Sequence, residues 1–166
     1  AQLFFGPLSD RFGRRVPLLA GMSVYVAAAF ACAFAPSFGA LLALRFVQGL
    51  GAAATRVIAV SIVRDRFGGR AMAEVMSMVF VVFMIIPVIA PGAGQVLLLA
   101  FDWPSIFLFM GAAALVFTVW TWARLPETLR EEHRRPLTAA SILDGFRIVA
   151  TNRMSVCYTL AFTAIM

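Results

Sequence analysis

The sequence predicts an all-α membrane protein with several spanning helices, and three observations lead to this fold class. Apolar residues make up 62% of the chain and charged residues only 13%, whereas a soluble domain carries about 25% charged residues. The apolar residues form runs long enough to cross a bilayer, which takes about 20 residues per helix. Most arginines lie in alternate loops between these runs. These observations predict a helical bundle whose outer surface faces lipid.

Four complete spans are expected, because four apolar runs are each bounded by polar or turn-forming residues. They cover residues 16–34, 39–63, 71–100 and 103–123. Pro87 and Pro91 interrupt the third run, and Trp103 and Trp120 mark the two ends of the fourth, as interfacial tryptophans do. Residues 1–8 look like the end of a helix and residues 154–166 like the start of another. We therefore expect the sequence to be a fragment, truncated at both ends.

The net charge of +6 comes from arginine alone, because the chain contains no lysine. Connections 35–38 and 101–102 contain no basic residue, whereas the other loops do. The loop arginines are Arg11, Arg14, Arg15, Arg64, Arg66, Arg70, Arg124, Arg130, Arg134, Arg135, Arg147 and Arg153. By the positive-inside rule, the arginine-rich loops are cytoplasmic. Since these arginines punctuate apolar runs, no nucleic-acid partner is expected.

The longest loop and the reactive side chains suggest no catalysis. Residues 137–152 are expected to form a short amphipathic helix or a solvated connector, and His133 is expected to be solvated. Cys32 and Cys157 each lie inside an apolar run and are expected to be packing residues. The chain offers no nucleophile–base pair, metal-ligand spacing or phosphate loop. We expect neither an enzyme nor a bound cofactor or metal.

Arg45 and Arg56 lie within the second span, where a charge near the bilayer centre costs about 2.5–3.5 kcal/mol. At about 100° per residue, one face of this helix gathers its polar and small residues. They are Arg45, Gln48, Ala52, Thr55, Arg56 and Ala59. We expect this face to meet protein or a wet cavity, with Gly49 and Gly51 giving room for close helix approach. The alternative is that both arginines snorkel towards the headgroups.

We hypothesise that Arg45 pairs with an acidic or carbonyl group on a helix outside this sequence. Through its positive charge, Arg45 would then tune the pKa of a proton-binding carboxylate.

Residues 6–15, GPLSDRFGRR, resemble the signature between the second and third helices of the major facilitator superfamily. The matching positions are Gly6, Asp10, Arg11, Gly13, Arg14 and Arg15. We expect Gly6 to allow close helix approach and Gly13 to permit a tight turn. Asp10 is expected to accept from a basic side chain or to sit at a helix N-terminus. The resemblance implies a cytoplasmic latch between the two halves of the protein.

Three further segments extend the resemblance. Residues 44–53 resemble the fourth-helix signature that the family links to proton coupling, with Arg45, Gln48 and Gly49 at its key positions. Residues 125–128, LPET, resemble the motif that closes the sixth helix. Segment 65–70 echoes segment 10–15, and we interpret the echo as shared turn chemistry rather than a second latch.

Residues 87–95 resemble the antiporter motif of the fifth helix. Pro87, Pro91, Gly92 and Gly94 roughly fit, whereas Ala90 and Gln95 depart from the usual glycines. The Ala-Pro pair is similar to the bicyclomycin-resistance branch of drug:proton antiporters. The two prolines are expected to bend the helix. A kinked helix with a purely structural role is the alternative.

The resemblance implies three regions and one leading function. Residues 1–123 would be most of the N-terminal half, 124–153 the central cytoplasmic loop, and 154–166 the start of the second half. The protein would be a monomer in a bacterial inner membrane that exports drug-like molecules in exchange for protons. Candidate cavity residues are Arg56, Met84 and Gln95. The alternatives are a symporter or uniporter of a polar solute in the same superfamily, and a membrane scaffold or sensor.

Overall fold

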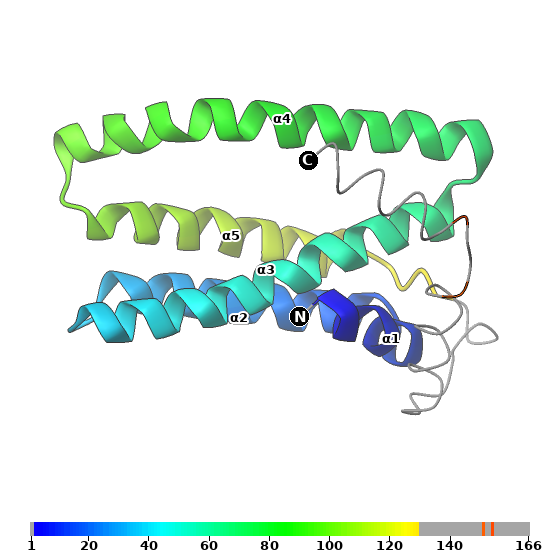
Figure 1. Ribbon diagram of the computed structural model, residues 1–166, viewed down its shortest axis with the longest axis horizontal. Helices are drawn as coiled ribbons and strands as arrows, with labels where there is room; N and C mark the ends of the chain where they lie inside the picture. The colour runs from blue at the N-terminus through cyan, green and yellow to red at the C-terminus, as the bar shows by residue number, and fades with distance from the viewer. Residues whose placement is uncertain (1, 130–150, 152–153, 155–166) are drawn as a thin grey trace. The chain divides into compact units, whose positions relative to one another are not determined.

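The regular structure is all helical in the part of the chain that the computed structural model describes, residues 2–129, 151 and 154. The chain divides into two compact units, Ala1–Arg134 and Arg135–Met166, and the first contains the five helices labelled in Figure 1. They are α1 (Gln2–Phe12), α2 (Arg15–Ala33), α3 (Phe38–Arg66), α4 (Gly69–Ala100) and α5 (Pro104–Arg124). The all-α fold class is confirmed.

The four expected spans are confirmed as helices α2 to α5, each long and apolar enough to cross a bilayer. The observed α3 runs beyond its predicted end and includes Arg64 and Arg66. Its last turn is closed by a hydrogen bond of 2.9 Å from the Phe67 N–H to the Val63 carbonyl. Charged residues can extend a helix outside the hydrocarbon, because their side chains reach water or headgroups. The apolar run therefore marks the spanning part of α3 and not its full length.

Helix α4 is continuous with Pro87 and Pro91 inside it, so the single span expected over residues 71–100 is confirmed. The two prolines are one turn apart. Proline has no N–H, so two backbone hydrogen bonds of the helix are lost, one at each proline. The carbonyl left without a partner by Pro91 is that of Pro87, so both losses fall within one short stretch of α4. Spanning helices tolerate such prolines through small local adjustments. A bend at this stretch stays a prediction.

Helices α2 and α3 make the most extensive contact in the first unit, followed by α2 and α5. The crossing of α2 and α3 is close because glycines face one another: a Cβ added at Gly51 would lie 2.8 Å from the backbone nitrogen of Tyr25, and one at Gly21 would lie 3.2 Å from the Gly51 carbonyl oxygen. Beside this crossing, Leu18, Ala54 and Ile58 form a small buried core. Helix α2 is thus held between α3 and α5.

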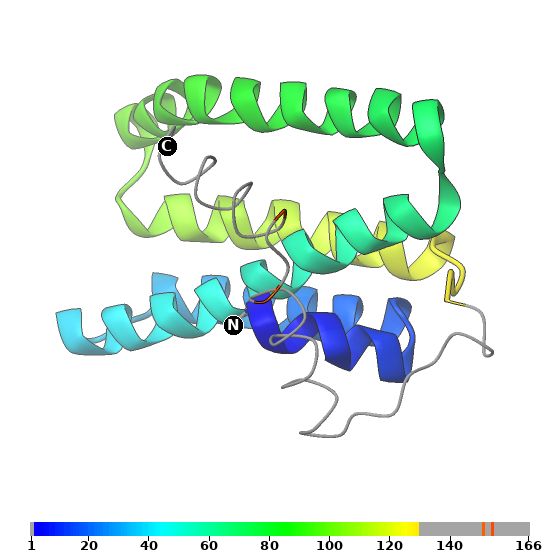
Figure 2. The same cartoon turned by 45° about the vertical axis from the view of Figure 1, so that its right-hand side comes forward.

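Helix α4 lies apart from the other helices in both ribbon views and makes few contacts with α3 and α5 (Figures 1 and 2). Every residue of α4 is described, and none is buried. Its exposed side chains include Val82, Ile86 and Leu99, which is 83% exposed. An apolar surface of this size needs lipid or further protein around it.

Several sequence expectations lie outside the described residues. These are the amphipathic helix in 137–152, the solvated His133, Cys157 and the span opening at 154–166, of which the structure describes only Thr151 and Met154, both helical. The domain boundary expected after residue 123 stays a prediction. Cys32 is buried and free, in keeping with its expected packing role.

Candidate functional site

The described loop arginines gather at one end of the helix stack, which we call the arginine end. Helices α1, α3 and α5 finish there, and α2 and α4 begin there (Figure 1). Its residues are Arg11, Arg14, Arg15, Arg64, Arg66, Arg70 and Arg124. The opposite end carries the turns around Ser37 and Asp102. The expected sorting of charge is confirmed for these residues, and the side of the membrane on which they lie stays a prediction.

Arg14 is the centre of a buried polar cluster at the arginine end. Its side chain is 4% exposed, and its Nη1 lies 2.6 Å from Asp10 Oδ1. The same Nη1 donates to the Ser9 hydroxyl at 2.6 Å, and Nε donates to Asp65 Oδ2 at 2.9 Å. Ser9 in turn donates to the Gly6 carbonyl at 2.8 Å. One guanidinium thus joins the end of α1 to the end of α3.

Two sequence interpretations change at this cluster. Asp10 does accept from a basic side chain, as expected, but it lies in the last turn of α1 rather than at a helix N-terminus. Asp65 is the residue that sequence reasoning missed, because the echo of segment 10–15 was interpreted as shared turn chemistry and cytoplasmic charge, with no contact between the two segments. Arg14 links the two segments, because its guanidinium donates to Asp10 of the first and to Asp65 of the second.

Glu127 caps the N-terminus of α2 from the far end of the described chain. Its Oε1 accepts from the Arg14 N–H at 2.8 Å, and its Oε2 accepts from the Arg15 N–H at 3.2 Å. The cap residue of α2 makes no side-chain cap bond of its own. The first N–H groups of a helix have no partner within it and carry partial positive charge. The Glu127 carboxylate accepts hydrogen bonds from these N–H groups, and its negative charge offsets their partial positive charge.

Gly13 makes room for the Glu127 carboxylate. Its φ of +86° confirms the tight turn expected there, and a Cβ at this position would lie 2.7 Å from the Glu127 carboxyl carbon. Any other residue at Gly13 would strain the backbone and would push the Glu127 carboxylate out of its place.

Glu127 makes the stability of its contact with the start of α2 depend on pH. Burial opposes the charge on Glu127, but backbone N–H bonds from Arg14, Leu129, Arg15 and Thr128 outweigh it and lower its pKa below the ordinary value of a glutamate. An acid whose pKa falls on folding contributes stability above its unfolded pKa and loses it as the pH drops through the folded value. We expect Glu127→Gln to lower the melting temperature of the full-length protein in detergent at pH 7, with the difference from wild type shrinking below about pH 4.3, the ordinary pKa of an unfolded glutamate.

Glu74→Gln is the matched control for this experiment, because Glu74 is a carboxylate whose side chain is 64% exposed. Its melting temperature should follow that of the wild type at every pH. A Glu127→Gln difference that stays constant down to pH 3 would contradict the assigned role.

The other signature positions at this end have different surroundings. The Arg15 Nη2 donates to the Trp122 carbonyl at 2.6 Å, which ties the start of α2 to the end of α5. Arg11 lies over the ring of Phe12 at 5.2 Å and takes no part in the Arg14 cluster. No described atom lies within 4 Å of a Cβ built at Gly6. The close approach expected at Gly6 is not met among the described helices, since its position faces open space.

Arg45 and Gln48 form a polar pair within the span of α3. Arg45 Nη1 donates to Gln48 Oε1 at 2.8 Å, and the guanidinium lies 5.7 Å from the centre of the Phe107 ring of α5. Gln48 is 2% exposed. Its Nε2 is buried and has no hydrogen-bond partner among the described residues. The pair therefore presents a guanidinium and an unused amide donor side by side.

The two glycines of the fourth-helix signature, Gly49 and Gly51, have different surroundings. Gly51 lies in the close crossing with α2, as expected, whereas a Cβ at Gly49 would meet no described atom within 4 Å. The expected close approach at Gly49 is thus not met, because Gly49 is two residues from Gly51 and therefore points about 200° away from it around the helix. Gly21, the partner of Gly51 on α2, was not identified from the sequence.

Arg56 lines a cavity of about 390 Å³ between α2, α3, α4 and α5. Met22, Tyr25, Phe83 and Phe117 contribute its apolar walls. The Arg56 guanidinium lies 5.8 Å from the centre of the Phe83 ring. This volume lies within the range of small-molecule sites, roughly 300–1,000 Å³.

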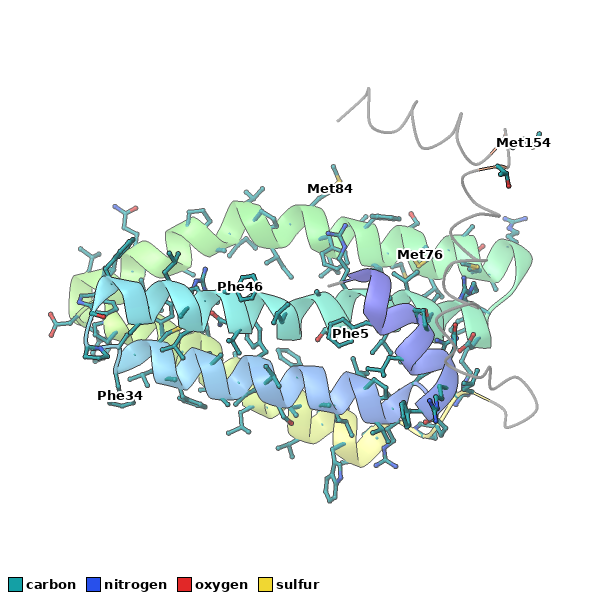
Figure 3. The ribbon with its side chains drawn as sticks, turned by 60° about the horizontal axis from the view of Figure 1, so that its bottom comes forward. Phe5, Phe34, Phe46, Met76, Met84 and Met154 are labelled. Atoms are coloured by element: carbon teal, nitrogen blue, oxygen red, sulfur yellow. The ribbon has the colours of Figure 1, made fainter. Side chains whose placement is uncertain are left out.

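The other two candidate cavity residues do not line this space. Met84 is 75% exposed and lies on the outer side of α4, away from α2, α3 and α5 (Figure 3). Gln95 is also exposed. Of the antiporter-like positions on α4, Pro87, Pro91 and Gly92 are exposed and Gly94 is half-buried. Functional roles for all six residues stay predictions. Among the described residues, no group of His, Cys, Asp or Glu is arranged to hold a metal ion.

Four apolar spans, a charge cluster confined to one end and polar side chains within α3 define a polytopic α-helical membrane protein. Comparison with known proteins gives its family. The sequence model of the Major Facilitator Superfamily matches residues 1–166, so the chain belongs to that superfamily and its helices are part of that fold.

Three bacterial relatives illustrate the similarity. A bicyclomycin resistance protein homolog of Haemophilus influenzae is 36% identical over 165 residues, covering 96% of this chain and 40% of the relative. The multidrug resistance protein MdtL of Citrobacter koseri is 33% identical, covering 98% of this chain and 43% of the relative. An uncharacterized MFS-type transporter of Bacillus subtilis, YdgK, is 34% identical over 161 residues, covering 96% of this chain and 40% of the relative. The chain thus spans about two-fifths of the length of these relatives.

Proposed function

We propose that the full-length protein is a secondary transporter that exports drug-like small molecules in exchange for protons by alternating access. The observation that carries this proposal is the pair of donors inside α3: the Arg45 guanidinium and the unpartnered Gln48 Nε2. A buried donor without an acceptor costs about 1–3 kcal/mol. A carboxylate on a helix beyond the described residues would accept from Arg45, which is exposed among the described helices, and would lie beside Gln48.

Such a carboxylate would be suited to proton coupling. A guanidinium within hydrogen-bond reach favours the ionised acid and lowers its pKa, whereas a desolvated site favours the protonated acid. Movement of the helices between the two access states would change the balance and so bind or release a proton. Arg45 is the positioning and tuning residue in this scheme, and Gln48 holds its guanidinium.

The direction of transport and the substrate class rest on two supports. With the arginine end in the cytoplasm, the Arg14 cluster would lie at the inner mouth, where its opening and closing would gate access. The relatives are named for bicyclomycin resistance and multidrug resistance. Export of such compounds from a bacterial cell, by a monomer in the inner membrane, is the function most consistent with both.

The test uses the full-length protein in a pump-deficient bacterium. We expect wild type to raise the inhibitory concentration of bicyclomycin and Arg45→Ala to abolish this effect with membrane expression unchanged. Arg66→Ala, which removes an exposed arginine at the end of the same helix, should retain resistance. Normal resistance in Arg45→Ala would reject the role of Arg45.

A protonophore separates antiport from the alternative mechanisms. Added to energised cells expressing wild type, it should raise accumulation of a fluorescent drug to the level of Arg45→Ala cells. A polar-solute symporter in the same superfamily would instead confer no resistance. It would take up protons together with its solute.

A further inference from the structure

The cavity between α2, α3, α4 and α5 combines apolar walls with one charge. Of the described residues that line it, Arg56 is the only charged one. The hydroxyls of Thr55 and Thr118 also line it, but each donates to a carbonyl of its own helix, Gly51 at 3.3 Å and Ala114 at 2.7 Å. A ligand in this space therefore meets aromatic and aliphatic surface and a single guanidinium.

Arg56 has no opposite charge within the described chain. Its recorded contact is the Phe83 ring, and the ion pairs among residues 2–129 involve Arg14 and Arg70 instead. Arg56 is exposed among the described residues but lies within a membrane span, where a charge is costly unless an anion or water meets it. A counter-charge is the missing component of this cavity.

The guanidinium is also held away from the membrane surface. Arg56 is ten residues, about 15 Å, from Arg66 along α3. Phe83, on which its guanidinium lies, is about 21 Å from the start of α4 at the arginine end. Contact with Phe83 keeps the charge turned into the cavity instead of towards the headgroups. A phospholipid headgroup would have to leave the interface to reach it.

We propose that this cavity binds a small lipophilic anion, with Arg56 as its counter-charge and the walls around Met22, Tyr25 and Phe117 covering its apolar body. The inference rests on the proposed function in that it names one class of molecule that the transporter would carry. A volume of about 390 Å³ suits a compound of two or three aromatic rings rather than a lipid with two acyl chains. A compound with the same body and no charge would lose the pairing with Arg56.

Two fluorescent probes with the same anilinonaphthalene body test this directly. One is the anion 8-anilinonaphthalene-1-sulfonate and the other is the neutral N-phenyl-1-naphthylamine. Binding to the full-length protein is measured in phosphatidylcholine nanodiscs, with empty nanodiscs subtracted. We expect Arg56→Gln to weaken binding of the anion about tenfold or more, the loss of one charge-assisted contact, and to change binding of the neutral probe by less than about twofold. Arg56→Lys should retain most of the anion's affinity.

Arg64→Gln is the matched control, because it removes an exposed arginine of the same helix outside the cavity, and both probes should bind to it as to wild type. Equal losses of both probes in Arg56→Gln, or no loss of the anion, would overturn the proposal. So would competition by phosphatidylglycerol added to the nanodiscs, which would identify a lipid as the occupant. Because binding is read without transport, anion binding that depends on Arg56 in a protein that exports nothing would refute the proposed function alone.

Discussion

Replacing Arg14 by alanine is expected to lower the free energy of unfolding of the full-length protein by about 3 kcal/mol, since removal of one member of a buried ionic group typically costs about 3–5 kcal/mol. The value lies at the lower end because Asp10 remains 36% and Asp65 19% exposed. The substitution leaves two carboxylates and the fully buried Ser9 hydroxyl without their shared donor. The ends of α1 and α3 would then repel one another. Thermal unfolding in detergent measures the loss.

Arg70→Ala provides a control with the same sequence spacing. Arg70 and Glu74 form an i,i+4 pair, as Asp10 and Arg14 do, but the Arg70 side chain is 94% exposed. Exposed pairs of this kind contribute about 0.3–0.5 kcal/mol. A loss in Arg14→Ala no larger than that in Arg70→Ala would mean that the Arg14 cluster does not hold the arginine end together.

Gly51→Ala is expected to destabilise the crossing of α2 and α3 by about 1–3 kcal/mol, the range for forcing an extra methyl group into a packed core. The new Cβ would lie 2.8 Å from the Tyr25 nitrogen and 3.1 Å from its Cα, both backbone atoms that cannot rotate away. The helices must separate, and the contact of Leu18 with Ala54 and Ile58 loosens with them. A lower melting temperature of the full-length protein reports the effect.

Gly49→Ala separates this clash from the general effect of alanine in a helix. No described atom lies within 4 Å of its added Cβ, and alanine is favoured over glycine in helices by about 0.5–1 kcal/mol. We expect Gly49→Ala to match or exceed the wild-type melting temperature. Equal destabilisation by the two substitutions would contradict the close crossing at Gly51.

The helices could be predicted because their signal is local. Each span is a continuous apolar run, and lipid demands such a run whatever the rest of the chain does. The exact ends could not, because α3 continues through Arg64 and Arg66 after its apolar run is over. Helix α4 continues through Pro87 and Pro91, as expected for one span, because the surroundings of a helix decide whether a proline breaks it.

The contacts of the site could be predicted only where they are near in sequence. Arg14 and Asp10 are four residues apart, and Arg45 and Gln48 three apart. Asp65 and Glu127 reach Arg14 across 51 and 113 residues, so no spacing rule reveals them. The sequence did contain hints of these contacts, in the echo between segments 10–15 and 65–70 and in the LPET segment. Only the packed helices show that Asp65 and Glu127 both bind Arg14. The facing pair Gly21 and Gly51 was hidden in the same way.

The position of the arginine end in the cytoplasm is the assumption on which the latch, the direction of export and the proton path all depend. It is tested by cysteine labelling of the full-length protein, freed of native cysteines, with Ser37→Cys and Gly68→Cys introduced one at a time at opposite ends of α3. A membrane-impermeant maleimide should label Ser37→Cys in intact cells, and Gly68→Cys only after the cells are opened. Labelling of Gly68→Cys in intact cells would place the arginine end outside and contradict the account.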